Sequence, residues 1–399
     1  MFLSLFIILF FGVIGGYIFE KIHLPKLMWY LILGILIGPS IFNIVDGKLL
    51  EISSYLRQIA LVIILTRSGL SLDIDSLKKI GRPALLMCFV PACFEILGIF
   101  IFAPLLLNIS HIESLLLGSV LAAVSPAIVV PRMIKIKEEN YGVDKNISEL
   151  VLAGASCDDI FVIVLFYSFK SLVSSTNFNS ITLLNIPCSI FLGITAGFII
   201  GLLLSIIFKH INVPTEAKVI IILGISFGLL TIESAIKNYI SFSSLLGIIV
   251  IGIIINRNNK VEAKQIENKY KSLWIGFEIL LFSLVGCIFD IKTALSSEGA
   301  IIVGLILISL CFRSLGVLVC LIKTNYNIKE KLFIVLSYIP KATVQASIGA
   351  IAINEGLACG NIVLIGAIVS ILLSAPLGAI LIDKTYKKLL SKTNLNYIE

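Results

Sequence analysis

The sequence predicts an all-α polytopic membrane protein with about thirteen transmembrane helices. Of its 399 residues, 58% are hydrophobic and 14% are charged, whereas a soluble domain carries about 25% charged residues. Apolar stretches of roughly 18 residues or more recur along almost the whole chain, and each is long enough to span a bilayer. In lipid every backbone polar group needs an internal partner, so these stretches must be helices.

The spans are delimited by the polar breaks between apolar runs. The first run has no basic leader or small-residue cleavage site and precedes the loop-like Glu20-Lys21-Ile22-His23, so we interpret it as a helix and not as a removed signal. In chain order the predicted spans cover residues 3–19, 27–44, 58–72, 83–107, 114–131, 148–169, 181–208, 217–236, 240–256, 272–290, 300–322, 332–353 and 361–382.

Lysine and arginine are distributed unevenly between the predicted loops. Most of them follow odd-numbered spans, as Arg132, Lys264 and Lys384 do. Cytoplasmic loops carry such an excess, which places the N-terminus outside the cell and the C-terminus in the cytoplasm. Because membrane orientation accounts for these basic loops, the net charge of +7 does not indicate that the protein binds nucleic acid.

Two spans contain helix-breaking residues in their interior. Ser125-Pro126 lies in the fifth span, and Pro340-Lys341 lies in the twelfth. Proline removes an amide donor and clashes with the preceding turn, and a broken backbone at membrane depth needs a wet cavity or surrounding protein. Since the fifth and twelfth spans cross in opposite directions, two discontinuous helices would give an inverted-repeat transporter with its site at the midplane. Two ordinary proline kinks are the alternative.

Asp158 and Asp159 lie near the middle of the sixth span. A charged residue at this depth costs several kcal/mol, so a functional or paired role is the default. Neighbours in a helix point about 100° apart, which implies two different partners. We expect one carboxylate to bind a cation or a proton and the other to pair with Lys341, which stands beside the second break. A purely structural ion-pair network is the alternative.

Further polar residues lie inside spans. Glu95 and Arg313 form a second candidate pair, which we interpret as a lock within the core because leaving either charge unpaired would be expensive. Neutral oxygens beside the breaks, on Ser125, Thr343 and Gln345, could complete cation coordination or only bond the broken backbone. Arg67 could line a cavity, Lys170 and Glu233 lie near span ends, and Glu278 stays ambiguous.

Small residues also form patterns. Gly193, Gly197 and Gly201 recur at four-residue spacing, which permits close helix approach either within the fold or in a dimer. The eight cysteines nearly all fall in apolar segments without metal-ligand spacing, so we interpret them as small buried hydrophobes and expect no disulfide framework.

At these residues the chain resembles the monovalent cation/proton antiporter superfamily, particularly its NHA branch of sodium/proton antiporters. The matching segments occur in the expected order over most of the chain: Gly34–Pro39, Arg67–Leu70, Ser125–Pro131, Cys157–Ile160 and Pro340–Ala346.

The resemblance implies an NhaA-like antiporter fold with two crossed discontinuous helices and an elevator mechanism. It implies a core of helices within about 58–169 and 272–353, a dimerisation domain within about 1–44 and 181–256, and a last helix at 361–382, all in one unit of 1–399. Asp159 would then be the carrier of Na⁺ or Li⁺ and of the proton, and Asp158 the partner of Lys341. Relatives often have a lysine at the place of Arg313, which stays charged at any working pH and would pair with Glu95.

The function expected from the sequence is secondary active exchange of Na⁺ or Li⁺ for H⁺ across the cytoplasmic membrane, by a homodimer in membrane lipid, without cofactor or enzymatic activity. K⁺/H⁺ exchange and symport of an organic solute with Na⁺ on the same scaffold are the transport alternatives. An intramembrane aspartyl protease would need aspartates on two facing helices and often a Gly-x-Gly-Asp motif, and neither feature is present.

Overall fold

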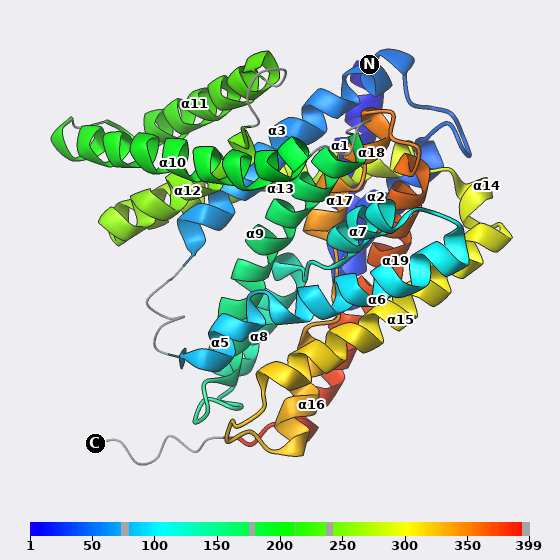
Figure 1. Ribbon diagram of the computed structural model, residues 1–399, viewed down its shortest axis with the longest axis vertical. Helices are drawn as coiled ribbons and strands as arrows, with labels where there is room; N and C mark the ends of the chain where they lie inside the picture. The colour runs from blue at the N-terminus through cyan, green and yellow to red at the C-terminus, as the bar shows by residue number, and fades with distance from the viewer. Residues whose placement is uncertain (73–79, 175–179, 212, 237–241, 393–399) are drawn as a thin grey trace. The chain divides into compact units, whose positions relative to one another are not determined.

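The computed structural model describes residues 1–72, 80–174, 180–211, 213–236 and 242–392, with the backbone alone for 180–187. Among them the one β interaction is an isolated bridge between Tyr141 and Lys392. The helices labelled in Figure 1 are α1 (Phe2–Lys21), α2 (Lys26–Ile37), α3 (Gly47–Ser71), α5 (Arg82–Met87), α6 (Val90–Leu107), α7 (His111–Leu121), α8 (Pro126–Glu138), α9 (Ile147–Ser174), α10 (Ser180–His210), α11 (Thr215–Ile236), α12 (Ser244–Asn258), α13 (Lys260–Cys287), α14 (Ile291–Ala294), α15 (Ser297–Cys320), α16 (Ile328–Ser337), α17 (Thr343–Ile348), α18 (Ile351–Asn354) and α19 (Gly360–Leu389).

The predicted fold class is confirmed. In the described part of the chain, 10 segments are long and apolar enough to cross a membrane, and α2 and α12 are shorter apolar helices. The interrupted segment from α16 to α18 corresponds to the twelfth predicted span. The total of thirteen remains a prediction, and the first two residues of the span predicted at 240–256 lie outside the described residues.

Helix ends differ from the predicted spans where polar residues continue a helix. The helix α3 begins at Gly47 instead of 58, and α13 begins at Lys260 instead of 272. Hydropathy marks only the apolar part of a helix, so polar first turns escape it. The helix α2 ends at Ile37, before the predicted 44, because Gly38 is extended and a residue that precedes proline disfavours the helical region.

The chain forms two compact units. Unit 1 comprises Met1–Glu51, Asp73–Phe169 and Phe282–Glu399, and unit 2 comprises Ile52–Leu72 and Lys170–Leu281. Residues 1–44, which the resemblance assigns to a dimerisation domain, therefore belong to the same compact unit as both broken helices. The division into a mobile core and a dimerisation domain stays a prediction.

In unit 2 the glycines of α10 pack against α12. A Cβ at Gly193 would lie 2.4 Å from the carbonyl oxygen of Ser243, and one at Gly197 would lie 2.4 Å from that of Gly247. The glycine repeat therefore serves helix packing within the unit. In the same unit Glu233 accepts hydrogen bonds from the amide (3.1 Å) and the hydroxyl of Ser244, so it caps the start of α12.

This packing predicts that alanine substitutions at two glycines of unit 2 have different effects on thermal stability. Replacing Gly197 by alanine should lower the unfolding temperature, because the new Cβ would clash with α12 backbone. Gly228→Ala is the matched control: its Cβ would meet nothing within 4 Å, and alanine is favoured over glycine in a helix by about 1 kcal/mol. Thermal unfolding of both purified variants checks this, and equal unfolding temperatures would contradict it.

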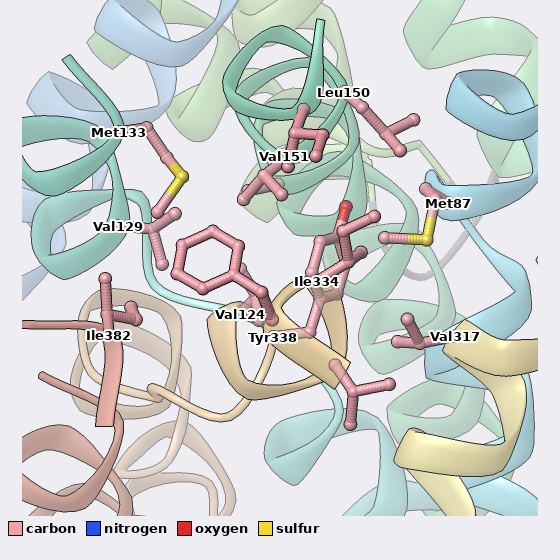
Figure 2. Packing of buried hydrophobic residues seen from close by; sticks show 14 of the residues in the cluster. Met87, Val124, Val129, Met133, Leu150, Val151, Val317, Ile334, Tyr338 and Ile382 are labelled. Carbon is pink, nitrogen blue, oxygen red and sulfur yellow. The ribbon is translucent and has the colours of Figure 1, made fainter. Parts of the chain in front are cut away.

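In unit 1 the helix α15 packs along α6, and α6 also packs on α7. Beside them a hydrophobic cluster surrounds Tyr338, with Val129 and Met133 from α8 and Leu150 and Val151 from α9 (Figure 2). This packing fixes α8, α9 and α16 against one another, and thereby positions the ends of both broken helices.

Candidate ion-binding site

Both predicted helix breaks are present. The helix α7 ends at Leu121, and α8 begins at Pro126 with Ser125 in an extended conformation. The helix α16 ends at Ser337, and α17 begins at Thr343. Proline suits the first turn of α8 because no intrahelical partner exists there for an amide.

The two breaks touch each other. The amide of Ser125 donates a hydrogen bond of 2.8 Å to the carbonyl oxygen of Pro340. Two segments that are more than 200 residues apart therefore meet backbone to backbone, at the points where neither is helical.

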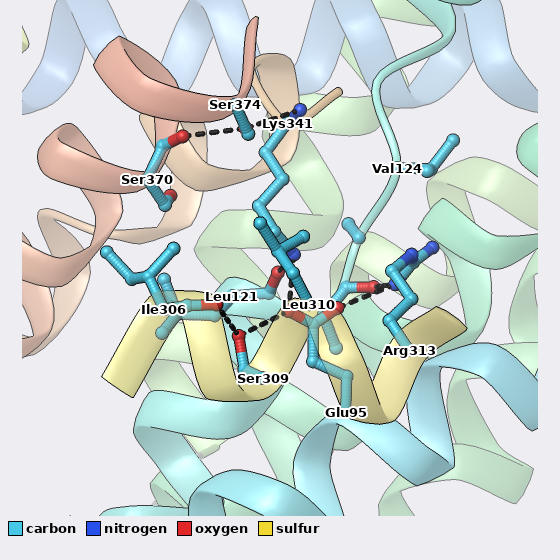
Figure 3. Close-up of polar contacts among 12 residues, drawn as sticks. Glu95, Leu121, Val124, Ile306, Ser309, Leu310, Arg313, Lys341, Ser370 and Ser374 are labelled. Atoms are coloured by element: carbon cyan, nitrogen blue, oxygen red, sulfur yellow. Dashed lines mark hydrogen bonds and ion pairs between the residues drawn. The ribbon is translucent and has the colours of Figure 1, made fainter. Parts of the chain in front are cut away.

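Four buried charges gather at this meeting point, and we call Glu95, Arg313, Lys341 and Asp158 the four-charge network. Arg313 Nη1 lies 2.9 Å from Glu95 Oε2, and Arg313 Nη2 lies 2.8 Å from Asp158 Oδ2. Lys341 Nζ lies 2.6 Å from Glu95 Oε1. Figure 3 shows Glu95 on α6 below α15, with the Lys341 side chain extended toward it. Two cations and two anions balance, so the network as a whole is neutral.

The network also satisfies the broken ends of α7 and α8. Lys341 Nζ donates to the carbonyl oxygen of Leu121, and Arg313 Nη1 donates to that of Ala122. Asp158 Oδ2 accepts a hydrogen bond of 2.9 Å from the amide of Val124. Cations are favoured at a helix C-terminus and anions near the N-terminus of the next helix, so Lys341, Arg313 and Asp158 each lie where the broken backbone stabilises the charge.

The structure gives Asp158 a different partner from the one expected. Asp158 pairs with Arg313, and Lys341 pairs with Glu95. The guanidinium has five donors in a planar fork, which lets Arg313 contact Glu95 and Asp158 at once. The expected contact between Glu95 and Arg313 is present.

Asp159 stands apart from this network. It is 5% exposed, and its Oδ1 has no hydrogen-bond partner. Within the described part of the chain no cationic side chain lies within ion-pair distance of it, whereas Asp158 beside it has Arg313. Asp159 is therefore a buried carboxyl group whose negative charge nothing in the described chain neutralises.

The neutral oxygens beside the breaks are all buried. Gln345 Nε2 donates a hydrogen bond of 2.8 Å to the carbonyl oxygen of Ala123, while its Oε1 and the Ser125 hydroxyl have no hydrogen-bond partner. Thr343 is the first residue of α17 and is buried as well. Gln345 thus bonds the broken backbone through its nitrogen and leaves an acceptor free, so both expected roles remain compatible with its geometry.

Sequence reasoning missed several groups that hold the network. Ser309 donates a hydrogen bond of 2.9 Å to Glu95, and the carbonyl oxygen of Tyr338 accepts one of 2.8 Å from Arg313. The Ser374 hydroxyl accepts one of 3.0 Å from the amide of Lys341. Ser309 lies four residues before Arg313 and therefore on the same helix face. This spacing could have identified Ser309 from the sequence.

Three other ionisable residues that the sequence singled out, Arg67, Lys170 and Glu278, lie in unit 2. The Nε of Arg67 is 3.5 Å from Glu267, which Lys264 also contacts. Arg67 is therefore not among the residues that the structure gathers at the breaks.

Comparisons with known proteins identify the family of the chain. Residues 5–386 match the family model described as "Sodium/hydrogen exchanger, transmembrane". The chain is 32% identical to human sodium/hydrogen exchanger 9B2, in an alignment that covers 97% of this chain and 75% of that protein. It is 30% identical to human sodium/hydrogen exchanger 9B1, with 98% of this chain and 78% of that protein covered.

A solved structure shares the fold. The sodium proton antiporter MjNhaP1 from Methanocaldococcus jannaschii at pH 8 superposes with a TM-score of 0.81 at 21% identity, covering 96% of this chain and 97% of that one. The family model that matches residues 5–386 and the 32% identity to human sodium/hydrogen exchanger 9B2 show that the chain belongs to the sodium/hydrogen exchanger family.

Proposed function

We propose that this chain exchanges Na⁺ or Li⁺ for H⁺, with Asp159 as the group that binds both. The observation that carries the proposal is the charge balance: the four-charge network is neutral, and Asp159 adds one buried carboxylate without a counter-charge. An isolated buried charge is strongly unfavourable. A proton and a monovalent cation each carry one positive charge, so either can neutralise the Asp159 carboxylate. The two therefore compete for the same oxygens.

This competition is sufficient for coupled exchange. If the site changes sides only when Asp159 is neutralised, an inward proton must be replaced by an outward cation. One pH unit corresponds to about 1.4 kcal/mol per proton, enough for a tenfold cation gradient in a one-for-one exchange. Since the network keeps its own charges balanced, one-for-one exchange moves no net charge.

The elevator mechanism and the coordinating residues belong to the same proposal. Every member of the four-charge network and Asp159 lies in unit 1, which supports movement of the site as one body. The free oxygens on Ser125 and Gln345 are the kind of ligand that hard cations prefer, and Thr343 offers another. We further propose a homodimer in the cytoplasmic membrane, with its N-terminus outside.

Reconstitution into liposomes tests this function. A pH-sensitive dye inside the vesicles should report alkalinisation or acidification when a gradient of Na⁺ or Li⁺ is imposed, and no response to choline. K⁺ in place of Na⁺ tests the K⁺/H⁺ alternative, and an imposed membrane potential should leave the initial rate unchanged. Absence of any cation-dependent proton movement from folded protein would overturn the proposal.

A further inference from the structure

Two half-buried thiols beside the network are not used by the proposed exchange. Cys88 lies between α5 and α6, and Cys157 lies on α9 immediately before Asp158. The two thiols lie close enough to interact electrostatically with each other. Cys88 Sγ donates to the carbonyl oxygen of Ala84 at 3.2 Å.

Neighbouring contacts fix this pairing independently. A Cβ at Gly154 would lie 2.8 Å from the Cβ of Met87, and the rings of Phe89 and Phe161 have centroids 6.0 Å apart. Positions 154, 157 and 161 share one face of a helix because they are three and four residues apart. The consecutive residues 87, 88 and 89 therefore run along that face, which holds Cys88 against Cys157.

We propose that Cys88 and Cys157 are a redox-sensitive pair that a peroxide converts into an intramolecular disulfide, which slows exchange. One thiol sulfur attacks the peroxide O–O bond, forming a sulfenic acid and releasing water. The second thiol then attacks that sulfur, forming the S–S bond and releasing a second water. The two sulfurs together lose two electrons, and the peroxide gains them.

The position of this bond explains its effect on the site. A disulfide holds its two sulfurs about 2.05 Å apart and restricts the distance between the two Cα atoms, so the bond would fix the spacing between α9 and the junction before α6. The next residue on α9 is Asp158, which Val124 and Arg313 hold, and α6 carries Glu95. The crosslink therefore ties together two helices that contribute to the four-charge network.

Peptide mapping of the oxidised protein tests the pair. Reduced, full-length protein in liposomes is treated with hydrogen peroxide, remaining thiols are alkylated, and digestion without reductant should give one crosslinked peptide containing Cys88 and Cys157. A reductant should remove it. Cys157→Ser should abolish the crosslinked peptide, whereas Cys93→Ser, at an exposed cysteine on α6, should leave it unchanged.

Exchange is measured on the same vesicles, and this readout rests on the proposed function. Oxidation should lower the initial rate by about tenfold or more, as small displacements of functional groups do, and reductant or Cys157→Ser should restore it. Free thiols after peroxide treatment, or a sulfinic acid on one cysteine without a crosslink, would refute the proposal that Cys88 and Cys157 form a disulfide. A crosslink without loss of rate would overturn its effect on transport. A crosslink in protein that exchanges nothing even when reduced would support the pair and refute the proposed function instead.

Discussion

Replacing Asp159 by asparagine should reduce cation-dependent proton movement to the level of empty liposomes. The asparagine amide cannot titrate and carries no charge, so it neither releases a proton nor attracts Na⁺ in exchange for one. The fold should be retained, because the substitution removes a buried carboxyl group that has no counter-charge. Dye fluorescence in proteoliposomes measures the exchange, and thermal unfolding of the same preparation measures stability.

A carboxylate elsewhere in unit 1 provides the control for this variant. Asp290 caps the start of α14 by accepting from the amide of Lys292 at 3.0 Å, and asparagine is an equally good cap. Asp290→Asn should therefore exchange at the rate of the unmodified protein. Normal pH-driven Na⁺ exchange by Asp159→Asn would rule out Asp159 as the carrier.

Replacing Arg313 by methionine should destabilise the protein by about 3–5 kcal/mol, because it leaves buried carboxylates without their shared cation. Arg313 contacts Glu95 and Asp158 and is 1% exposed. Lys341 can still pair with Glu95, so the loss concentrates on Asp158. Thermal or denaturant unfolding in detergent measures the change.

Two further variants separate this loss from a general effect of removing arginine. Arg132 also forms an ion pair, at 3.2 Å to Asp383, but both side chains are partly exposed, and such pairs contribute about 0–1 kcal/mol. Arg132→Met should therefore have a small effect. Adding Asp158→Asn to Arg313→Met should recover part of the stability, and no recovery would show that Asp158 is not the uncompensated partner.

The sequence was sufficient to predict the all-helical fold class and the two breaks because each rests on local chemistry. Long apolar runs require helices in lipid, and the two breaks fall at Pro126 and Pro340. The charged residues at the site were also identifiable, since Glu95, Asp158 and Arg313 are conspicuous within apolar runs.

The pairing of those charges could not be predicted in the same way. Which cation meets Asp158 depends on the rotation and depth of α9, α15 and the second break, and several arrangements satisfy the same list of charges. The sequence favoured Lys341 because it stands beside a proline, but the longer forked side chain of Arg313 takes that place. The backbone groups of Leu121, Ala122 and Val124 carry no sequence signal at all.

The contact between the two breaks restricts how related sequences can vary. Position 125 contributes its amide to this contact, so proline is excluded there, while any residue at position 340 could supply the carbonyl oxygen that accepts it. Positions 121 to 124 likewise contribute main-chain atoms, and their side chains are free to change within the limits of size. The contact between the two breaks can therefore persist in relatives that carry different residues at these positions.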